Sequence, residues 1–189
     1  MNKTSRTAGG PTYIALLRGI NVGGHKIVKM EKLRNALMML GFEDVKTYIQ
    51  SGNVVFKAPS RESENLSKRI EETVLREFGF PVPVIVRTAE ELGEVLKENQ
   101  FCREKGVDAS KLYVTFLSRL PERTAVKMLD AITVVPDRFC CSGREIYLYC
   151  PNGLGGTKLS FDAFEKVLSV GATTRNWNTV TRLYEMSSG

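Results

Sequence analysis

The sequence predicts an α+β fold built from two ferredoxin-like halves, each an antiparallel sheet with helices on one face. Over residues 12–88, segments typical of strands and helices follow the order β-α-β-β-α-β, which is the ferredoxin-like order. Over residues 110–189 the order β-α-β-β-α recurs, although a final strand is not evident and the halves share no clear residue repeat. Residues 1–11 are expected to form a disordered tail, and residues 89–109 a helix and a linker.

In the first half, the continuous apolar run 12–18 predicts a strand buried on both faces. Further strands are predicted at 44–50, 53–57 and 82–87, the first two joined by a tight turn at Ser51-Gly52. Alternation along this hairpin places four apolar side chains on one face: Val45, Ile49, Val54 and Phe56. Apolar residues at helical spacing predict two helices between the strands: Met30, Leu33, Leu37 and Leu40 in one, and Leu66, Ile70, Val74 and Phe78 in the other.

The second half begins with a predicted strand at 111–117 and a helix over 121–132, which has Pro121 in its first turn. A hairpin of two strands, 137–142 and 145–150, follows. A helix then carries Phe161, Phe164, Val167 and Leu168, and a last helix from about Asn176 carries Trp177, Val180 and Leu183.

Charge and hydropathy exclude some classes of protein. The net charge is +6, which favours phosphate or nucleic-acid partners, but no run of five like charges marks a dedicated basic arm. No apolar run approaches the ~20 residues that span a bilayer, and the polar N-terminus lacks the apolar core of a signal peptide. We therefore expect a cytoplasmic protein without a membrane partner.

A metal site is not predicted. The four cysteines have no CxxC spacing and His25 is the only histidine, so the converging ligands of a zinc site are not recognisable. In the predicted hairpin, Cys141 faces Ile146. Cys150 faces Asp137 in the same register, so no cross-strand disulfide follows, and reduced packing cysteines are expected.

The Gly-rich loop after the first strand is the first candidate binding site. It leads from the strand, with the sequence RGINVGGHK, to a helix start, where N–H groups and the helix dipole attract anions. It matches neither the Walker A nor the GxGxxG pattern, and a loop that only makes a turn is the alternative. Its candidate ligand-binding residues are Arg18, Asn21, Gly23, Gly24, His25 and Lys26.

Topology adds a second stretch to this site. In a β-α-β-β-α-β unit, the loop after the first strand and the hairpin between the middle strands emerge at the same end. Gln50, Ser51 and Asn53 are therefore expected beside the Gly-rich loop as further ligand-binding residues. No carboxylate occurs between Arg18 and Met30, which favours an anion. The alternative is two polar loops that share hydrogen bonds.

Two later stretches have similar features. The loop 151–160, PNGLGGTKLS, also joins a strand to a helix, but Leu159 after the lysine separates it from a P-loop, and a capped helix entry is the alternative. The segment 173–179, TTRNWNT, places Arg, Asn and Thr at a helix start, which suits phosphate or a planar polar group. The candidate ligand-binding residues of these stretches are Lys158, Arg175, Asn176 and Asn178.

Four segments carry a family resemblance: LLRGINVGG, TYIQSGNVVF, YCPNGLGGTKLS and GATTRNWNTVTRL. Together they resemble a bacterial family known as domain of unknown function 1697, from about Tyr13 to Met186. The resemblance implies two small ferredoxin-like halves. It implies no catalytic residues, because the family has no established activity. This chain departs from the family at Gly156–Lys158, where a basic residue ahead of Ser-Lys is more usual.

These observations leave three functions open. The first is binding of a phosphate-bearing, nucleotide-like small molecule at the Gly-rich basic loops. The second is nucleic-acid binding, which is less favoured because the strand NVVFKA lacks the aromatic residues of RNA-binding sheets. The third is a protein-interaction or structural module without a small ligand. The sequence identifies no catalytic residue or cofactor and does not predict the oligomeric state, and whether the protein is an enzyme stays open.

Overall fold

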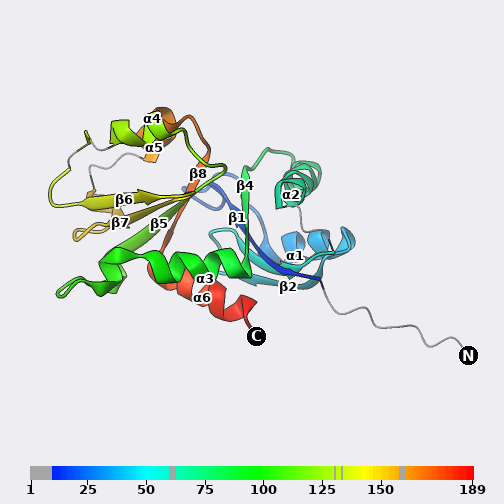
Figure 1. The fold of residues 1–189 in the computed structure, drawn as a ribbon. Coiled ribbons are helices and arrows are strands. Elements are labelled where there is room, and N and C mark those ends of the chain that lie inside the picture. The colour runs from blue at the N-terminus through cyan, green and yellow to red at the C-terminus, as the bar shows by residue number, and fades with distance from the viewer. Residues whose placement is uncertain (1–9, 60–62, 130, 133, 158–160) are drawn as a thin grey trace, which may run out of the picture. The chain divides into compact units, whose positions relative to one another are not determined.

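The computed structural model describes residues 10–59, 63–129, 131–132, 134–157 and 161–189. The chain divides into two compact units, Met1–Ala89 with Ser187–Gly189, and Glu90–Met186. Each unit contains one four-stranded sheet with helices packed on it (Figure 1). This confirms the predicted α+β fold class of two ferredoxin-like halves. Among the helices in the described part of the chain, none is long and apolar enough to cross a membrane.

The first unit has the predicted β-α-β-β-α-β order. Its elements are β1 (Thr12–Leu17), α1 (Met30–Met39), β2 (Glu43–Tyr48), β3 (Asn53–Lys57), α2 (Ser63–Phe78) and β4 (Val84–Thr88). The strands lie in the order β2-β3-β1-β4, and all neighbours are antiparallel. Because β1 and β2 run in the same direction, the loop after β1 and the β2–β3 turn emerge at one end of the sheet.

The core of the first unit lies between this sheet and the apolar faces of α1 and α2. Phe56 is fully buried there, and its ring centroid lies 4.5 Å from that of Phe42 and 5.8 Å from that of Tyr13. Aromatic rings of this size supply much of the apolar area that stabilises a small core. Helix α2 ends at Phe78, and Gly79 follows with a φ of 80°, a conformation that favours glycine at a helix end.

The prediction that Ile49 shares the core face of the hairpin is wrong. Val54 and Phe56 lie in the core as expected, but Ile49 is 50% exposed. The reason is the turn between β2 and β3, which spans residues 49–52 rather than two residues, because β2 ends at Tyr48. Ile49 has a φ of 48°, so it belongs to the turn and leaves the strand alternation.

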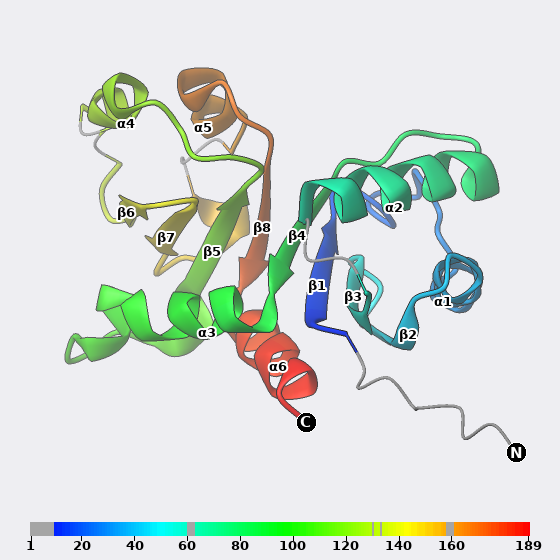
Figure 2. The ribbon, with the colours of Figure 1, turned by 45° about the vertical axis from the view of Figure 1, so that its right-hand side comes forward.

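The second unit repeats this arrangement. Its elements are α3 (Ala89–Glu98), the 3₁₀ turns η1 (Gln100–Arg103) and η2 (Ala109–Lys111), β5 (Leu112–Leu117), α4 (Arg123–Leu129), β6 (Arg138–Ser142), β7 (Glu145–Tyr149), η3 (Leu154–Gly156), α5 (Phe161–Leu168), β8 (Ala172–Asn176) and α6 (Trp177–Ser187). The strand order is β6-β7-β5-β8, again antiparallel throughout. Helices α4 and α5, which belong to the β-α-β-β-α-β order, lie on one side of this sheet, as predicted (Figures 1 and 2). Helices α3 and α6, which precede and follow that order, lie on the other side, where the sequence predicted no helix.

The structure supplies the final strand that the sequence did not reveal. In β8, the sequence ATTRN contains one apolar residue, so hydrophobic alternation gives no signal there. Pairing with β5 forms the strand instead, and the hydroxyl oxygens of Thr115 and Thr174 lie 2.7 Å apart across the two strands. Helix α4 spans Arg123–Leu129 and is therefore shorter than the predicted 121–132.

Equivalent backbone hydrogen bonds close the two sheets. The N–H of Leu17, at the end of β1, donates to the Gly52 carbonyl at 2.8 Å. The N–H of Leu117, at the end of β5, donates to the Arg144 carbonyl at the same distance. Each acceptor lies in the turn between the second and third strands of its unit. The similarity of the halves is therefore one of register and topology, which explains why no residue repeat accompanies it.

Candidate functional site

Three segments meet at the end of the first sheet where β1 finishes: residues 18–29, 49–52 and 79–83. We call them together the loop end. The Arg18 N–H donates to the Pro83 carbonyl at 2.9 Å, which joins the first segment to the third. The Leu17 N–H, bonded to Gly52 as described above, joins the end of β1 to the turn. The predicted juxtaposition of the Gly-rich loop with residues 50–53 is thus confirmed.

The Gly-rich loop forms a miniature hairpin. The Asn21 N–H donates to the Lys26 carbonyl at 3.2 Å, and the His25 N–H donates to the Val22 carbonyl at 3.0 Å. Gly23 and Gly24 occupy the turn with φ of 57° and 77°, the left-handed pair that a two-residue hairpin turn requires. Because α1 begins only at Met30, these glycines shape the hairpin tip and do not line the helix start.

Asn21 clamps the hairpin to the rest of the loop end. Its side-chain Oδ1 accepts from the Val28 N–H at 2.8 Å, and its Nδ2 donates to the Val28 carbonyl at 3.0 Å. Nδ2 also donates to the Gln50 carbonyl at 2.7 Å, which links the loop to the β2–β3 turn. Both ends of the amide are therefore engaged within the protein, so Asn21 positions the loop end.

Asn53 has a comparable role in the turn. Its side chain is fully buried, and Nδ2 donates to the Tyr48 carbonyl at 3.1 Å and to the Ser51 Oγ at 3.0 Å. These bonds close the four-residue turn at its base. Gln50 and Ser51 are exposed, so the turn presents their side chains at the surface while Asn53 stays below.

The exposed part of the loop end is cationic and partly apolar. His25, Lys26 and Lys29 are exposed, Arg18 is half-buried, and none of the three segments contains an aspartate or glutamate. The Lys26 Nζ donates to the Pro81 carbonyl at 3.0 Å, which holds the hairpin against the third segment. Sequence reasoning missed the apolar contribution, which consists of Val22, Ile27 and Ile49, exposed by 66%, 55% and 50%.

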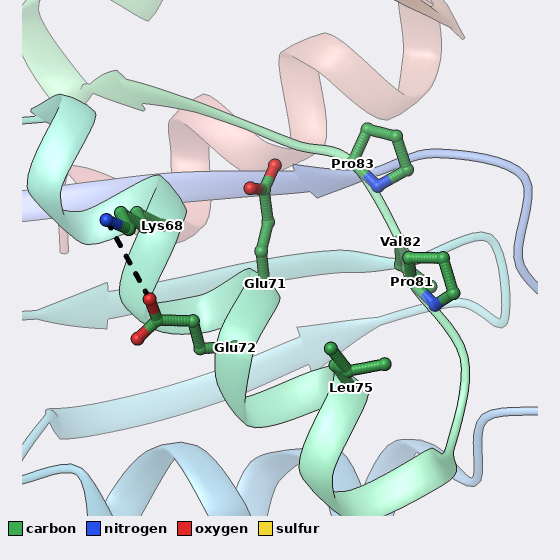
Figure 3. Close-up of a pocket in the computed structure, with 7 residues that line it drawn as sticks. All are labelled: Lys68, Glu71, Glu72, Leu75, Pro81, Val82 and Pro83. Carbon is green, nitrogen blue, oxygen red and sulfur yellow. Dashed lines mark ion pairs between the residues drawn. The ribbon is translucent and has the colours of Figure 1, made fainter.

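A groove of about 350 Å³ lies beside the loop end, between α2 and the segment before β4 (Figure 3). Its two acids are engaged: the Glu71 Oε1 accepts from the Val84 N–H at 2.8 Å, and Glu72 lies 4.0 Å from the Lys68 Nζ. The remaining lining is apolar and consists of Leu75, Pro81, Val82 and Pro83. The groove therefore adds apolar lining beside residues 81–83 of the loop end, and both of its acids are already engaged.

The candidates from the end of the chain belong to the second unit. The Asn176 Oδ1 accepts from the Thr179 N–H at 2.8 Å, so Asn176 caps α6 in the manner of a helix N-cap. Asn178 is exposed on the first turn of α6. Lys158 lies outside the described residues.

Arg175 is buried in β8 and has a counterpart in β4. Arg87 and Arg175 hold equivalent positions in the strand register, with exposed fractions of 1% and 8%. In each, Nη1 donates to the preceding carbonyl, at 3.1 Å to Val86 and at 2.8 Å to Thr174. Burial lowers the pKa of Arg175 to about 10, because desolvation disfavours the charged form. Because a buried arginine occupies the same strand position in both units, Arg175 has a structural role within β8.

The second Gly-rich loop is also engaged internally. It contains the short 3₁₀ turn η3, and Gly153 before this turn has a φ of 74°. The Thr157 hydroxyl donates a short hydrogen bond to the Asp137 Oδ2. Sequence reasoning did not select Asp137, and no sequence signal would have, because its surroundings arise from residues distant in the chain. Within the described residues, no three His, Cys, Asp or Glu side chains gather closely enough to hold a metal ion.

The cysteines differ in their accessibility, which gives a direct test of the fold. Cys102 is exposed, whereas Cys150 is buried, and burial and the Asp137 charge raise the pKa of the Cys150 thiol to about 11. At pH 8 we expect iodoacetamide to alkylate Cys102 in the native protein and Cys150 only after denaturation, because the thiolate is the nucleophile. Peptide mapping by mass spectrometry measures this, and fast native labelling of Cys150 would contradict the structure.

Comparisons with known proteins agree with this fold. A conserved bacterial protein, SP0830 from Streptococcus pneumoniae, is similar in structure, with a TM-score of 0.68 and 23% sequence identity. The likeness covers 95% of this chain and 99% of that one, and it concerns the fold alone. None of the curated proteins matches the chain. A family model described as "Protein of unknown function (DUF1697)" matches residues 11–147, and the chain therefore belongs to this family.

Proposed function

We propose that the loop end of the first unit binds a phosphate-bearing, nucleotide-like small molecule. The observation that carries the proposal is a cluster of cationic side chains, Arg18, Lys26 and Lys29, in segments without a carboxylate. His25 lies among them as a further hydrogen-bonding side chain. Charged donors of this kind form strong hydrogen bonds with phosphate oxygens. The backbone hydrogen bonds and the Asn21 clamp hold the three segments in place, so binding would not first require their assembly.

The apolar residues of the loop end support a ligand that is more than phosphate. Val22, Ile27 and Ile49 are each at least half exposed, and all three belong to segments of the loop end. A base, sugar or similar body could pack there while its phosphate meets the cations. Direct contact with the ligand is not proposed for every predicted residue. Asn21 and Gly23-Gly24 shape the Gly-rich loop, and Asn53 closes the β2–β3 turn, so we propose that they position the loop end.

Nucleic-acid binding through the sheet has less support. On the face away from α1 and α2, the two central strands carry Ile14, Leu16 and Val55, and RNA-binding sheets instead place aromatic side chains where bases stack. Protein interaction is the remaining alternative function, and the charge pattern of the loop end does not favour it over binding of a small anion. A cytoplasmic location stays part of the proposal.

Titration with ADP, inorganic pyrophosphate and adenosine tests the proposal. We expect ADP to bind more tightly than pyrophosphate, and adenosine to bind least, because ADP alone combines phosphate with an apolar body. Lys29→Met is expected to weaken ADP binding by about tenfold, the loss of one charge-assisted hydrogen bond. Lys29 suits this test because its side chain makes no capping hydrogen bond to α1. Isothermal titration calorimetry gives each affinity.

Lys105→Met is the matched control. It removes the same charge from an exposed position in the second unit, so ADP affinity should stay at the wild-type value. An equal loss in both variants would mean general electrostatic attraction, which salt would also abolish. The absence of binding by all three compounds at millimolar concentration would refute the proposal.

A further inference from the structure

A second pocket lies at the edge of the second sheet, beside the start of β6, and has a volume of about 480 Å³. Strand β6 is an edge strand that pairs only with β7. On one side of the pocket are the apolar residues Leu129, Ile132 and Val134, from α4 and the segment after it. Asp137, immediately before β6, also lines this pocket.

The Asp137 carboxylate is only half satisfied. Its exposed fraction is 8%, and its Oδ2 accepts from the Thr157 hydroxyl. Its Oδ1 is buried and has no hydrogen-bond partner in the described structure. Buried polar atoms almost always have a partner, and an unmet one costs about 1–3 kcal/mol, so a native exception calls for a missing donor.

The neighbouring arginine does not supply this donor. Arg138 is the first residue of β6, and its guanidinium is engaged with other residues. Arg138 instead donates to the Glu104 carboxylate at 2.7 Å. Its guanidinium carbon also lies 5.0 Å from the Phe101 ring centre and 5.1 Å from the Tyr149 ring centre. These contacts fix Arg138 as one wall of the pocket and leave Oδ1 without a cation.

We propose that this pocket binds a small organic cation, an ammonium or amidinium group on an apolar body. The cation would donate to the Asp137 Oδ1, and the body would pack against Leu129, Ile132 and Val134. Among the described lining residues, two carboxylates face one guanidinium, so the charge favours a cation. An organic cation fits better than a metal ion, because no metal-binding cluster of His, Cys, Asp or Glu exists in the described chain.

Benzamidine and benzamide form a matched pair of probes, because they share shape but only benzamidine is charged at neutral pH. NMR titration of ¹⁵N-labelled protein should show benzamidine perturbing the amides of residues 137–139. We expect it to bind at least about tenfold more tightly than benzamide. Asp137→Asn keeps the side-chain volume and removes the charge, and it should reduce benzamidine affinity to the level of benzamide.

Two further variants keep the proposal falsifiable. Glu122→Gln removes an exposed acid outside the pocket and should leave benzamidine binding unchanged. Val134→Trp fills the pocket and should abolish binding, which decides the question if Asp137→Asn does not fold. Equal affinity for the two probes, unaltered binding to Val134→Trp, or no perturbation at millimolar benzamidine would each overturn the proposal. In the last case a water molecule would satisfy Oδ1.

Discussion

Replacing Gly52 with alanine is expected to destabilise the first unit by about 2–5 kcal/mol. Gly52 has a φ of 81°, and the left-handed conformation costs a residue with a Cβ about 1–2 kcal/mol. The added Cβ would lie 2.7 Å from the Leu17 Cβ and 2.9 Å from the Ile20 Cδ1, both buried. Overpacking of this kind costs about 1–3 kcal/mol more. The Gly52 carbonyl also accepts from Leu17, so the turn cannot move away without losing that bond.

Gly24→Ala is the control that isolates the steric part of this loss. Gly24 has a φ of 77°, nearly that of Gly52, but no atom lies within 4 Å of the Cβ it would gain. We expect this variant to lose only about 1–2 kcal/mol, the cost of the backbone conformation. Urea unfolding monitored by circular dichroism gives both values. Equal losses in the two variants would contradict the packing of the turn against β1.

The predictable part of this fold is the part that hydrophobic periodicity controls. Leu33 and Leu37 share one helix face and lie in the core because their spacing matches the helical repeat. Periodicity fails where backbone geometry or pairing decides. Ile49 has the apolar character of a core residue, yet its positive φ places it in a turn. Strand β8 is polar, and its hydrogen bonds to β5 form the strand instead of apolar alternation.

The candidate site also has a part that the sequence could predict and a part that it could not. Topology predicted that the Gly-rich loop and the β2–β3 turn would be neighbours, and the Asn21–Gln50 hydrogen bond confirms it. The sequence could not show that Asn21 bonds the backbone at both ends of its amide, because Val28 and Gln50 become its partners only in the folded chain. Asp137 Oδ1, which has no hydrogen-bond partner among the described residues, is equally invisible in sequence, because the pocket around it brings together residues distant in the chain.

Asn21→Ala is expected to destabilise the first unit by about 2–4 kcal/mol. The substitution removes three hydrogen bonds, each worth about 0.5–1.5 kcal/mol, and two of them satisfy the backbone of Val28, which is 1% exposed. Asn21 also has a φ of 55°, which asparagine tolerates better than alanine does. Chemical denaturation measures the loss, and a change within about 0.5 kcal/mol, typical of surface substitutions, would contradict the clamp.

Two variants separate the clamp from the backbone conformation. Asn21→Gly removes the same hydrogen bonds but accepts a positive φ, so it should be more stable than Asn21→Ala by about 1 kcal/mol. Asn21→Asp keeps an acceptor for the Val28 N–H, but its second carboxylate oxygen would face the carbonyl oxygens of Val28 and Gln50 and repel them, so its loss should be at least as large as that of Asn21→Ala. Because the amide is fully engaged, these stability losses should accompany any loss of ADP affinity. A variant at Asn21 that loses affinity but keeps wild-type stability would instead place this side chain on the ligand.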